Sequence, residues 1–116
     1  MSLLKIGVVG PCAAGKSTLI QGLNAAGYYG KHIAQEHSGV PDMWKRLTSP
    51  NILIYLDVSY QTTIQRKNLN WTYKEYQEQI FRLRHAREHS DLVIFTDPLS
   101  PDEVLRITLN YIMRAK

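Results

Sequence analysis

The 116-residue sequence has a single cysteine and no long apolar run. A lone Cys12 excludes an internal disulfide framework and a zinc site built on cysteines. No window approaches the roughly 18 consecutive apolar residues of a membrane span. The apolar run from Leu3 leads into a glycine-containing loop instead of a small-residue cleavage site, which argues against a signal peptide. We therefore expect a cytoplasmic protein without a membrane partner.

The composition is that of an ordinary globular protein, with 44% apolar and 21% charged residues. A chain of this length is expected to form a single domain over residues 1–116. Fourteen Lys and Arg against ten Asp and Glu give a net charge of +4, and residues 61–90 carry an excess of basic side chains. Such an excess suits an anionic partner, either a nucleotide polyphosphate or a nucleic acid.

The most informative stretch is Gly10-Pro-Cys-Ala-Ala-Gly-Lys-Ser17, which fits the pattern G-x-x-x-x-G-K-[ST]. Glycines let successive backbone N–H groups turn toward phosphate oxygens at a helix N-terminus. In this motif Lys16 reaches the β- and γ-phosphates, and the Ser17 hydroxyl binds Mg²⁺. The loop favours a nucleotide over nucleic acid as the anionic partner. The expected nucleotide-binding residues are Gly10, Pro11, Cys12, Ala13, Ala14, Gly15, Lys16, Ser17 and Thr18.

The residues on either side of this loop have the patterns of a strand and a helix. Residues 3–9 form a short run rich in β-branched side chains, and residues 17–26 show helical apolar spacing that ends at Gly27. Further patterns predict strands over 31–34, 51–57 and 91–96, a polar loop over 35–41, and helices over 41–47, 59–68, 72–89 and 100–114.

Terminal signals accompany these helices. Pro41 is expected at the first position of the helix over 41–47, and Ile64 as the inward residue of the helix over 59–68. Thr72 with Glu75, and Ser100 with Glu103, fit capping boxes. The helix over 72–89 is expected to be the longest and to bury one face, which carries Tyr73, Tyr76, Ile80 and Leu83.

Strands that alternate with helices predict parallel βαβ units. The expected fold class is α/β, a three-layer P-loop NTPase fold with a mostly parallel sheet of about four to five strands and helices on both faces. Ligands of such sheets lie beyond the carboxyl ends of the strands. In this sequence those ends carry the loop, Glu36-His37, Asp57-Val-Ser59 and Asp97-Pro-Leu-Ser100, which should face one crevice.

Motifs of other P-loop classes are absent, namely D-x-x-G and N-K-x-D of GTPases and L-S-G-G-Q of ABC-type ATPases. The sequence instead resembles the small P-loop kinases of the nucleoside monophosphate kinase type, among them adenylate, thymidylate and shikimate kinases. The resemblance covers most of the chain. It rests on the N-terminal loop, on the strand over 51–57 followed by a helix with Arg66, and on Asp91-Leu-Val-Ile-Phe-Thr-Asp97 with the following Ser-Pro-Asp-Glu.

The sequence also departs from that family. It is short, with room for about four strands where five are expected, and it has no helical insertion that would enclose a nucleoside monophosphate. The Asp-Arg pair of thymidylate-type kinases is missing, and Gln35-Glu36-His37-Ser38 takes its place. Glu36 is therefore a candidate for a water-mediated Mg²⁺ contact or for a base toward an acceptor hydroxyl, with a surface-loop residue as the alternative.

The resemblance implies that Arg66 and Lys67 begin a lid over the ATP phosphates and that Arg82 touches the transferring phosphoryl group. A guanidinium suits this task because it stays charged and binds phosphoryl oxygens in a plane. For each arginine the alternative is a solvated helix face. Asp57 ends its strand on an acid, and it is either a carboxylate for Mg²⁺ or a structural residue.

A competing motif is His85-Ala-Arg-Glu88-His89, which spells H-x-x-E-H, the inverted zinc-peptidase signature. Two histidines four residues apart share a helix face and could hold Zn²⁺, with Glu88 as general base. The helix is expected to end directly after the motif, and the chain is small for that class of peptidase. Solvated histidines at a helix C-terminus are the favoured interpretation.

Four aromatic residues are candidates for stacking on a nucleotide base, and packing is the alternative for each of them. The resemblance also implies that the Pro98-Leu99 turn borders the base. The four aromatic residues are Tyr28, Tyr29, Trp44 and Trp71.

These patterns together predict a kinase-like protein that uses ATP and Mg²⁺ to phosphorylate a small acceptor such as a nucleoside, a nucleotide or a hydroxylated metabolite. The alternative is a non-catalytic ATP-binding switch that controls a partner or a homo-oligomer. A nucleic-acid-associated P-loop protein would rest on the basic segment alone. The expected catalytic residues are Lys16, Arg82, Arg66 and Glu36, and the expected metal contacts are Ser17 and Asp57.

Overall fold

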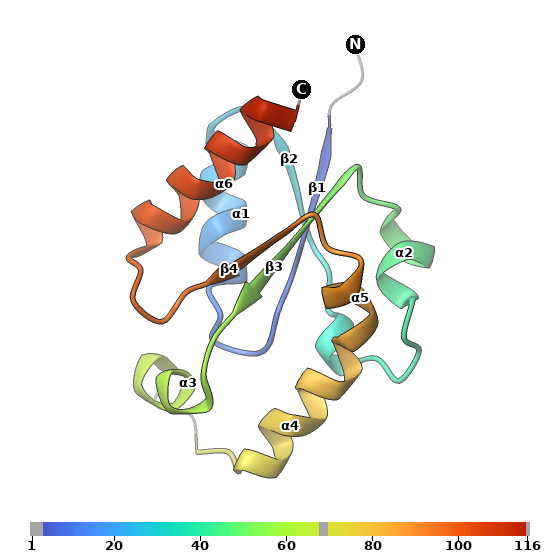
Figure 1. The fold of residues 1–116 in the computed structure, drawn as a ribbon, viewed down its shortest axis with the longest axis vertical. Helices are drawn as coiled ribbons and strands as arrows, with labels where there is room; N and C mark the ends of the chain where they lie inside the picture. The colour runs from blue at the N-terminus through green and yellow to red at the C-terminus, as the bar shows by residue number, and fades with distance from the viewer. Residues whose placement is uncertain (1–3, 68–69, 116) are drawn as a thin grey trace.

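The computed structural model describes residues 4–67 and 70–115. Within them, four parallel strands form one sheet in the order β2-β1-β3-β4, and helices flank it (Figure 1). The expected parallel α/β architecture is confirmed. The strands are β1 (Lys5–Val9), β2 (Tyr29–His32), β3 (Ile52–Asp57) and β4 (Leu92–Phe95). The helices are α1 (Lys16–Ala25), the 3₁₀ turn η1 (Gln35–His37), α2 (Met43–Thr48), α3 (Tyr60–Lys67), α4 (Tyr73–Arg82), α5 (Arg84–Glu88) and α6 (Pro101–Ala115).

Strand β3 is buried on both faces because its side chains alternate between two apolar clusters. Ile54 and Leu56 belong to the cluster that α1 and α6 cover. Leu53 and Tyr55 share the other cluster with Trp44 of α2 and Ala86 of α5. Figure 1 shows α1 and α6 on one side of the sheet and α2 and α5 on the other. Helices therefore cover both faces, as the alternating pattern predicts.

Both capping boxes are confirmed. The Glu75 backbone N–H donates to the Thr72 hydroxyl, and a Glu75 carboxylate oxygen accepts from the Thr72 backbone N–H. Ser100 and Glu103 make the same exchange at the start of α6. With 15 residues, α6 is longer than either α4 or α5. In the described ranges, no helix is both long and apolar enough to cross a lipid bilayer.

The single long helix expected over 72–89 is wrong, because the chain forms α4 and α5 with a break at Leu83. The Leu83 N–H is shared between the carbonyls of Gln79 and Ile80, which tightens the last turn of α4. The Arg82 carbonyl accepts from the Gln35 side chain at 3.3 Å. Tertiary contacts thus take over hydrogen bonds that a continuous helix would keep. Of the expected inward face, Leu83 is fully buried but Tyr73 is exposed.

The other strands and helices begin and end within one to two residues of the expected positions. Strand β2 begins two residues earlier than expected, since Gly30 pairs with Ile6 of β1 and lets α1 pass close to the strand. Helix α2 begins after Pro41, at Met43. In α3 the fully buried side chain is Thr63, and Ile64 is partly exposed. The expected residues Leu3 and Asn68 lie outside the described ranges.

Candidate functional site

A cavity of about 700 Å³ opens at the carboxyl ends of the strands, where the loop after β1 meets the segments that follow β2 and β4. The sequence predicts a shared crevice at this edge of the sheet, and the loop, Glu36 and the segment after β4 do meet there. The cavity is lined by Cys12, Ala13, Ala14, Gly15, Lys16, Ser17, Thr18, Leu19, His32, Glu36, Arg66, Lys67, Thr96, Leu99, Pro101 and Val104.

The loop between β1 and α1 begins at Gly10 and ends at Gly15, and its geometry favours glycine at both positions. A Cβ atom on Gly10 would lie 2.4 Å from the Leu56 carbonyl oxygen, so only glycine lets the loop pass β3 this closely. Gly15 has a φ of 96° and directly precedes α1, a backbone conformation that side chains disfavour. The Ala14 N–H donates to the Pro11 carbonyl at 3.2 Å, which closes the turn. The loop is thereby held in one compact conformation.

Lys16 lies at the start of α1 with its side chain folded under the loop and only 7% exposed. Its Nζ atom donates to the Gly10 carbonyl at 2.6 Å and to the Pro11 carbonyl at 3.1 Å. It also forms an ion pair with Glu36 Oε2 at 2.9 Å. Three oxygen atoms therefore hold the ammonium beside the loop, and Lys16 is one of the residues that line the cavity.

Glu36 is 3% exposed, which is unusual for a residue in a stretch that the sequence predicts as a polar loop. The turn η1 follows β2 directly and carries Gln35 and Glu36 inward. The second carboxylate oxygen of Glu36, Oε1, is buried and has no hydrogen-bond partner within the described part of the chain. The surface-loop alternative for Glu36 is thus wrong, because its carboxylate lies under the loop beside Lys16.

Arg66 and Lys67, at the end of α3, both line the cavity. The Arg66 guanidinium donates to the Thr96 carbonyl at 2.5 Å, to the Thr96 hydroxyl at 3.0 Å and to the Ala13 carbonyl at 3.3 Å. It therefore joins the loop to the end of β4. Arg66 and Lys67 therefore add two positive charges to the lining of the cavity, in addition to that of Lys16.

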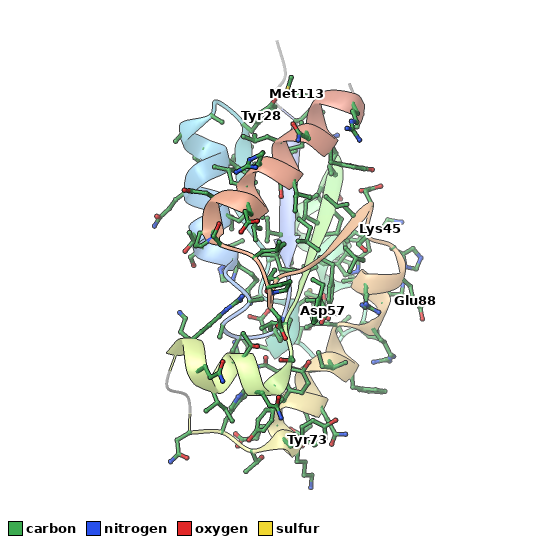
Figure 2. All side chains as sticks on the ribbon, turned by 60° about the vertical axis from the view of Figure 1, so that its left-hand side comes forward. Tyr28, Lys45, Asp57, Tyr73, Glu88 and Met113 are labelled. Carbon is green, nitrogen blue, oxygen red and sulfur yellow. The ribbon has the colours of Figure 1, made fainter. Side chains whose placement is uncertain are left out.

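Arg82 and Asp57 lie away from the lining of this cavity. The Arg82 guanidinium donates to the Glu36 carbonyl at 3.4 Å and borders a separate hollow on α4. Asp57 is labelled in Figure 2 where β3 ends, and its Oδ2 is 3.3 Å from the Arg87 guanidinium. Its Oδ1 accepts from the Val58 N–H. The structure thus gathers Lys16 and Glu36 at the loop, but it engages Asp57 in contacts of its own.

Gln79 contacts the loop, although the sequence analysis does not single it out. Its Oε1 accepts from the Cys12 backbone N–H at 3.0 Å, and its Nε2 donates to Cys12 Sγ at 3.2 Å. The side chain is buried although Gln79 lies on a largely exposed helix. The one signal in the sequence is a polar residue at an inward position of α4. The face that we expect to be buried carries Tyr73, Tyr76, Ile80 and Leu83 and does not include Gln79.

The histidines of the H-x-x-E-H segment stack on each other with ring centroids 4.1 Å apart. His85 Nδ1 accepts from the Trp44 indole, and His89 Nδ1 contacts the His85 carbonyl. Glu88 lies on the outer side of α5 (Figure 2). In the described residues, the one cluster of three metal-ligating side chains is Cys12, Glu36 and His37, so this segment gains no third ligand.

The aromatic candidates mostly pack within the protein. Trp44 is buried, and Tyr28 packs against the core cluster that α1 and α6 cover. Trp71 donates its indole N–H to the Thr63 hydroxyl and meets the Tyr76 ring edge-on. Tyr29 is partly exposed under the Lys31 ammonium. By contrast, Leu99 of the Pro98-Leu99 turn does line the cavity.

Asp97 ties the segment after β4 to the start of α3, because its Oδ1 accepts from the Ser59 N–H at 2.9 Å. Partial burial raises the pKa of the Asp97 carboxyl, but hydrogen bonds from Ser59 and Thr62 and the nearby Arg66 charge outweigh it. The net effect is a lowered pKa in the folded protein.

A lowered folded-state pKa means that Asp97 stabilises the fold above the unfolded pKa of about 3.9 and that this contribution is lost as the pH falls below it. We expect Asp97→Asn to lower the free energy of unfolding by about 1 kcal/mol at pH 7, and by much less at pH 2. Urea unfolding at both pH values measures the difference. Glu88→Gln, at an exposed position, is the control, and an equal loss at both pH values would contradict this role of Asp97.

The site thus combines a loop with a glycine at each end, a buried lysine–glutamate pair and the basic side chains of Arg66 and Lys67 around one cavity. No model of a known protein family matches the chain. A search of curated proteins finds no match to it either.

Proposed function

We propose that the chain is a P-loop kinase-like protein that binds ATP with Mg²⁺ in this cavity and transfers the γ-phosphoryl group to a small acceptor. The observation that carries the proposal is the position of Lys16. Its ammonium lies beneath the loop that opens α1, held by the Gly10 and Pro11 carbonyls at the wall of a cavity of about 700 Å³. A cavity of this size falls in the range of small-ligand sites.

Phosphate binding follows from the loop and the helix behind it. Backbone N–H groups at a helix N-terminus and the partial positive charge of that terminus attract phosphate oxygens. Residues Ala13 to Thr18 all line the cavity at this point. Lys16 adds a positive charge. Its carbonyl and carboxylate partners hold the ammonium in position and neutralise its charge only in part. The ammonium has three N–H donors, and all three have oxygen partners, so a phosphate oxygen would replace one of these contacts when it binds.

The residues present fit a magnesium ion that arrives with the nucleotide. The Ser17 hydroxyl lines the cavity beside Lys16 and is an oxygen donor of the kind that Mg²⁺ takes from proteins. Mg²⁺ bound with ATP neutralises charge on the β- and γ-phosphate oxygens. Asp57 is not assigned to the metal in this proposal because its carboxylate is engaged by Arg87 and Val58.

The remaining walls suit the other parts of the ligand. Leu99, Pro101 and Val104 form an apolar side on which a nucleobase can lie, since bases present flat apolar faces. Arg66 and Lys67 bring positive charge to the same cavity. We assign the phosphoryl clamp to Arg66, because its guanidinium already contacts the loop at Ala13.

Phosphoryl transfer needs positioning and charge stabilisation more than covalent chemistry. Lys16 and Arg66, which both line the cavity, supply the positive charge. Glu36 Oε1 is a buried carboxylate oxygen with no partner among the described residues, and it is the group that accepts the proton of an acceptor hydroxyl. The acceptor is therefore expected to carry a hydroxyl group that reaches the cavity beside Glu36.

We expect Arg66→Ala to lower kcat roughly 100-fold while the KM for ATP changes little, because a clamp acts mainly on charge that develops in the transition state. Arg82→Ala is the matched comparison, since Arg82 borders a different hollow. Steady-state kinetics of both variants, with circular dichroism to confirm folding, measure the effect. A larger loss in Arg82→Ala would move the clamp to Arg82 and overturn the assignment.

The experiment that tests the proposal is ADP release from ATP and Mg²⁺ in the presence of single acceptors. The panel contains nucleosides, nucleoside monophosphates and small hydroxylated metabolites. Release that rises with one acceptor, together with phosphorylated product by mass spectrometry, is the expected result. Absence of ATP binding would contradict the proposal altogether.

One observation favours a second function, an ATP-dependent switch without transfer. Gln79 of α4 holds the loop through both the backbone and the thiol of Cys12. A nucleotide that draws on the Cys12 N–H would release this contact, and α4 would then be free to move. Tight ATP binding without acceptor-dependent ADP release would support the switch over the kinase.

A further inference from the structure

Three side chains of different chemistry meet on the η1 side of the loop. They are the Cys12 thiol, the Glu36 carboxylate and the His37 imidazole, and one ligand atom of each lies within 4.8 Å of the others. Cys12 belongs to the loop after β1, whereas Glu36 and His37 belong to η1. We propose that these three residues bind a thiophilic divalent cation, Zn²⁺ or an ion of similar chemistry.

The unsatisfied oxygen of Glu36 points to a ligand. A carboxylate that is 3% exposed normally has partners for both oxygens, since a buried unpaired acceptor costs about 1–3 kcal/mol. Here Oε2 is held by Lys16 at 2.9 Å, and Oε1 has no hydrogen-bond partner among the described residues. The Lys16 contact fixes the orientation of the carboxylate. The Glu36 carboxylate is one of the three ligand groups, so a cation bound to it would give the unpartnered oxygen a partner.

The Cys12 thiol is also held in place. Gln79 accepts from the Cys12 N–H and donates its amide N–H to Sγ at 3.2 Å. Hydrogen bonds of this kind orient a metal ligand, and the thiolate is the form of cysteine that binds metal. On binding, the thiol proton is released to solvent. The loop thus presents one oriented sulfur ligand to Glu36.

His37 completes the group from the solvent side. Its side chain is 62% exposed, and its Nε2 atom lies 3.7 Å from Glu36 Oε2. Ligand distances of about 2.0–2.3 Å around a tetrahedral ion place neighbouring ligand atoms roughly 3.5 Å apart. The three ligand atoms lie within 4.8 Å of one another, so a bound ion needs small rotations of the Cys12 and Glu36 side chains as well as of the exposed His37 imidazole. The fourth position of a tetrahedral ion faces solvent and takes water.

The donor set decides the class of cation. One sulfur, one nitrogen and one oxygen ligand suit Zn²⁺, whereas Mg²⁺ takes oxygen ligands. A lone cysteine excludes zinc sites built on several cysteines, but it leaves a mixed site with one thiolate possible. This cation is therefore distinct from the Mg²⁺ that we propose to arrive with ATP.

Binding at this site does not depend on the proposed kinase function, because none of the three ligands requires a nucleotide. It has a consequence for that function. Glu36 Oε1 cannot hold the cation and accept an acceptor proton at the same time. We therefore expect Zn²⁺ to inhibit phosphoryl transfer, if transfer is found.

Titration of the purified chain with Co²⁺, in the absence of nucleotide, tests the proposal. Thiolate-bound Co²⁺ has a charge-transfer band in the near ultraviolet, and Cys12 is the single cysteine of the sequence, so this band reports on Cys12 alone. The expected result is a band that saturates at one Co²⁺ per chain and disappears when one equivalent of Zn²⁺ is added. Absence of the band with excess Co²⁺ would overturn the proposal.

Variants identify the ligands. Cys12→Ser should abolish the band, and His37→Gln should weaken Co²⁺ binding at least tenfold. The variant His89→Gln changes an exposed histidine directly after α5 and should bind Co²⁺ as the unchanged chain does. Circular dichroism confirms that each variant is folded. Co²⁺ affinity in His37→Gln equal to that of the unchanged chain would show that the cation binds elsewhere and would overturn the site.

Discussion

Loss of ATP binding is the expected result when Lys16 is replaced by methionine and Glu36 by glutamine in one chain. Lys16 carries the positive charge beneath the loop, at 2.6 Å from the Gly10 carbonyl. Charge-assisted hydrogen bonds to phosphate are among the strongest in proteins. We expect the affinity for ATP to fall at least about 100-fold, which corresponds to ~2.8 kcal/mol. Isothermal titration calorimetry with ATP and Mg²⁺ measures it.

The double variant is needed because the two charges are buried together. Lys16→Met alone leaves the Glu36 carboxylate buried without its cation, and breaking a buried pair in this way costs about 3–5 kcal/mol. The second substitution, Glu36→Gln, removes that uncompensated charge and should restore much of the stability. Urea unfolding of the single and double variants separates folding from binding. Undiminished ATP affinity in a folded double variant would remove the loop from the proposed function.

Gly10→Ala should destabilise the protein strongly. The added Cβ atom would lie 2.4 Å from the Leu56 carbonyl oxygen, and neither backbone can move without disturbing the sheet. Overpacking against fixed atoms costs about 1–3 kcal/mol and sometimes more, and the backbone contact places Gly10→Ala at ~3 kcal/mol. In a domain of this size that loss lowers Tm by roughly 10 °C or more. Thermal unfolding by circular dichroism measures the shift.

Gly39→Ala is the matched control for this prediction. A Cβ atom on Gly39 meets no atom within 4 Å, so its substitution should change the free energy of unfolding by less than about 0.5 kcal/mol. Equal unfolding midpoints for Gly10→Ala and Gly39→Ala would show that the loop does not pass β3 as closely as described. A selective loss in Gly10→Ala would support the loop geometry independently of any ligand.

Local signals account for the elements that sequence analysis predicts well. Each capping box depends on two residues three positions apart, and both boxes are present at Thr72 and Ser100. The continuous apolar run over 52–56 can be buried only between two layers, and it forms the central strand β3. These features are decided by neighbours in the chain, so no knowledge of the tertiary contacts is needed.

The break between α4 and α5 shows where local signals fail. Residues 72–89 have helical periodicity throughout, but the carbonyl of Arg82 is bonded by Gln35, a residue 47 positions earlier. The face that is buried is set by the loop and by η1, because Gln79 reaches Cys12. A pattern of apolar residues cannot indicate that a glutamine at an inward position has a loop amide as its partner. Tertiary packing overrides the local pattern in this segment.

The candidate site divides in the same way. The order of residues from Gly10 to Ser17 is by itself sufficient to predict a loop that opens a helix, because the required backbone conformation is local and depends on glycine. The sequence alone likewise determined the parallel α/β architecture, since alternating strand and helix patterns admit few connections.

Only the tertiary structure decided which distant side chains contact that loop and the cavity beside it. Glu36 lies beside Lys16 because β2 pairs with β1 and η1 then turns inward. Arg66 reaches the cavity and Arg82 does not, since α3 ends over the loop while α4 points its arginine toward the Glu36 carbonyl. The physical reason is that such contacts depend on strand register and helix placement, which side-chain packing over the whole chain determines.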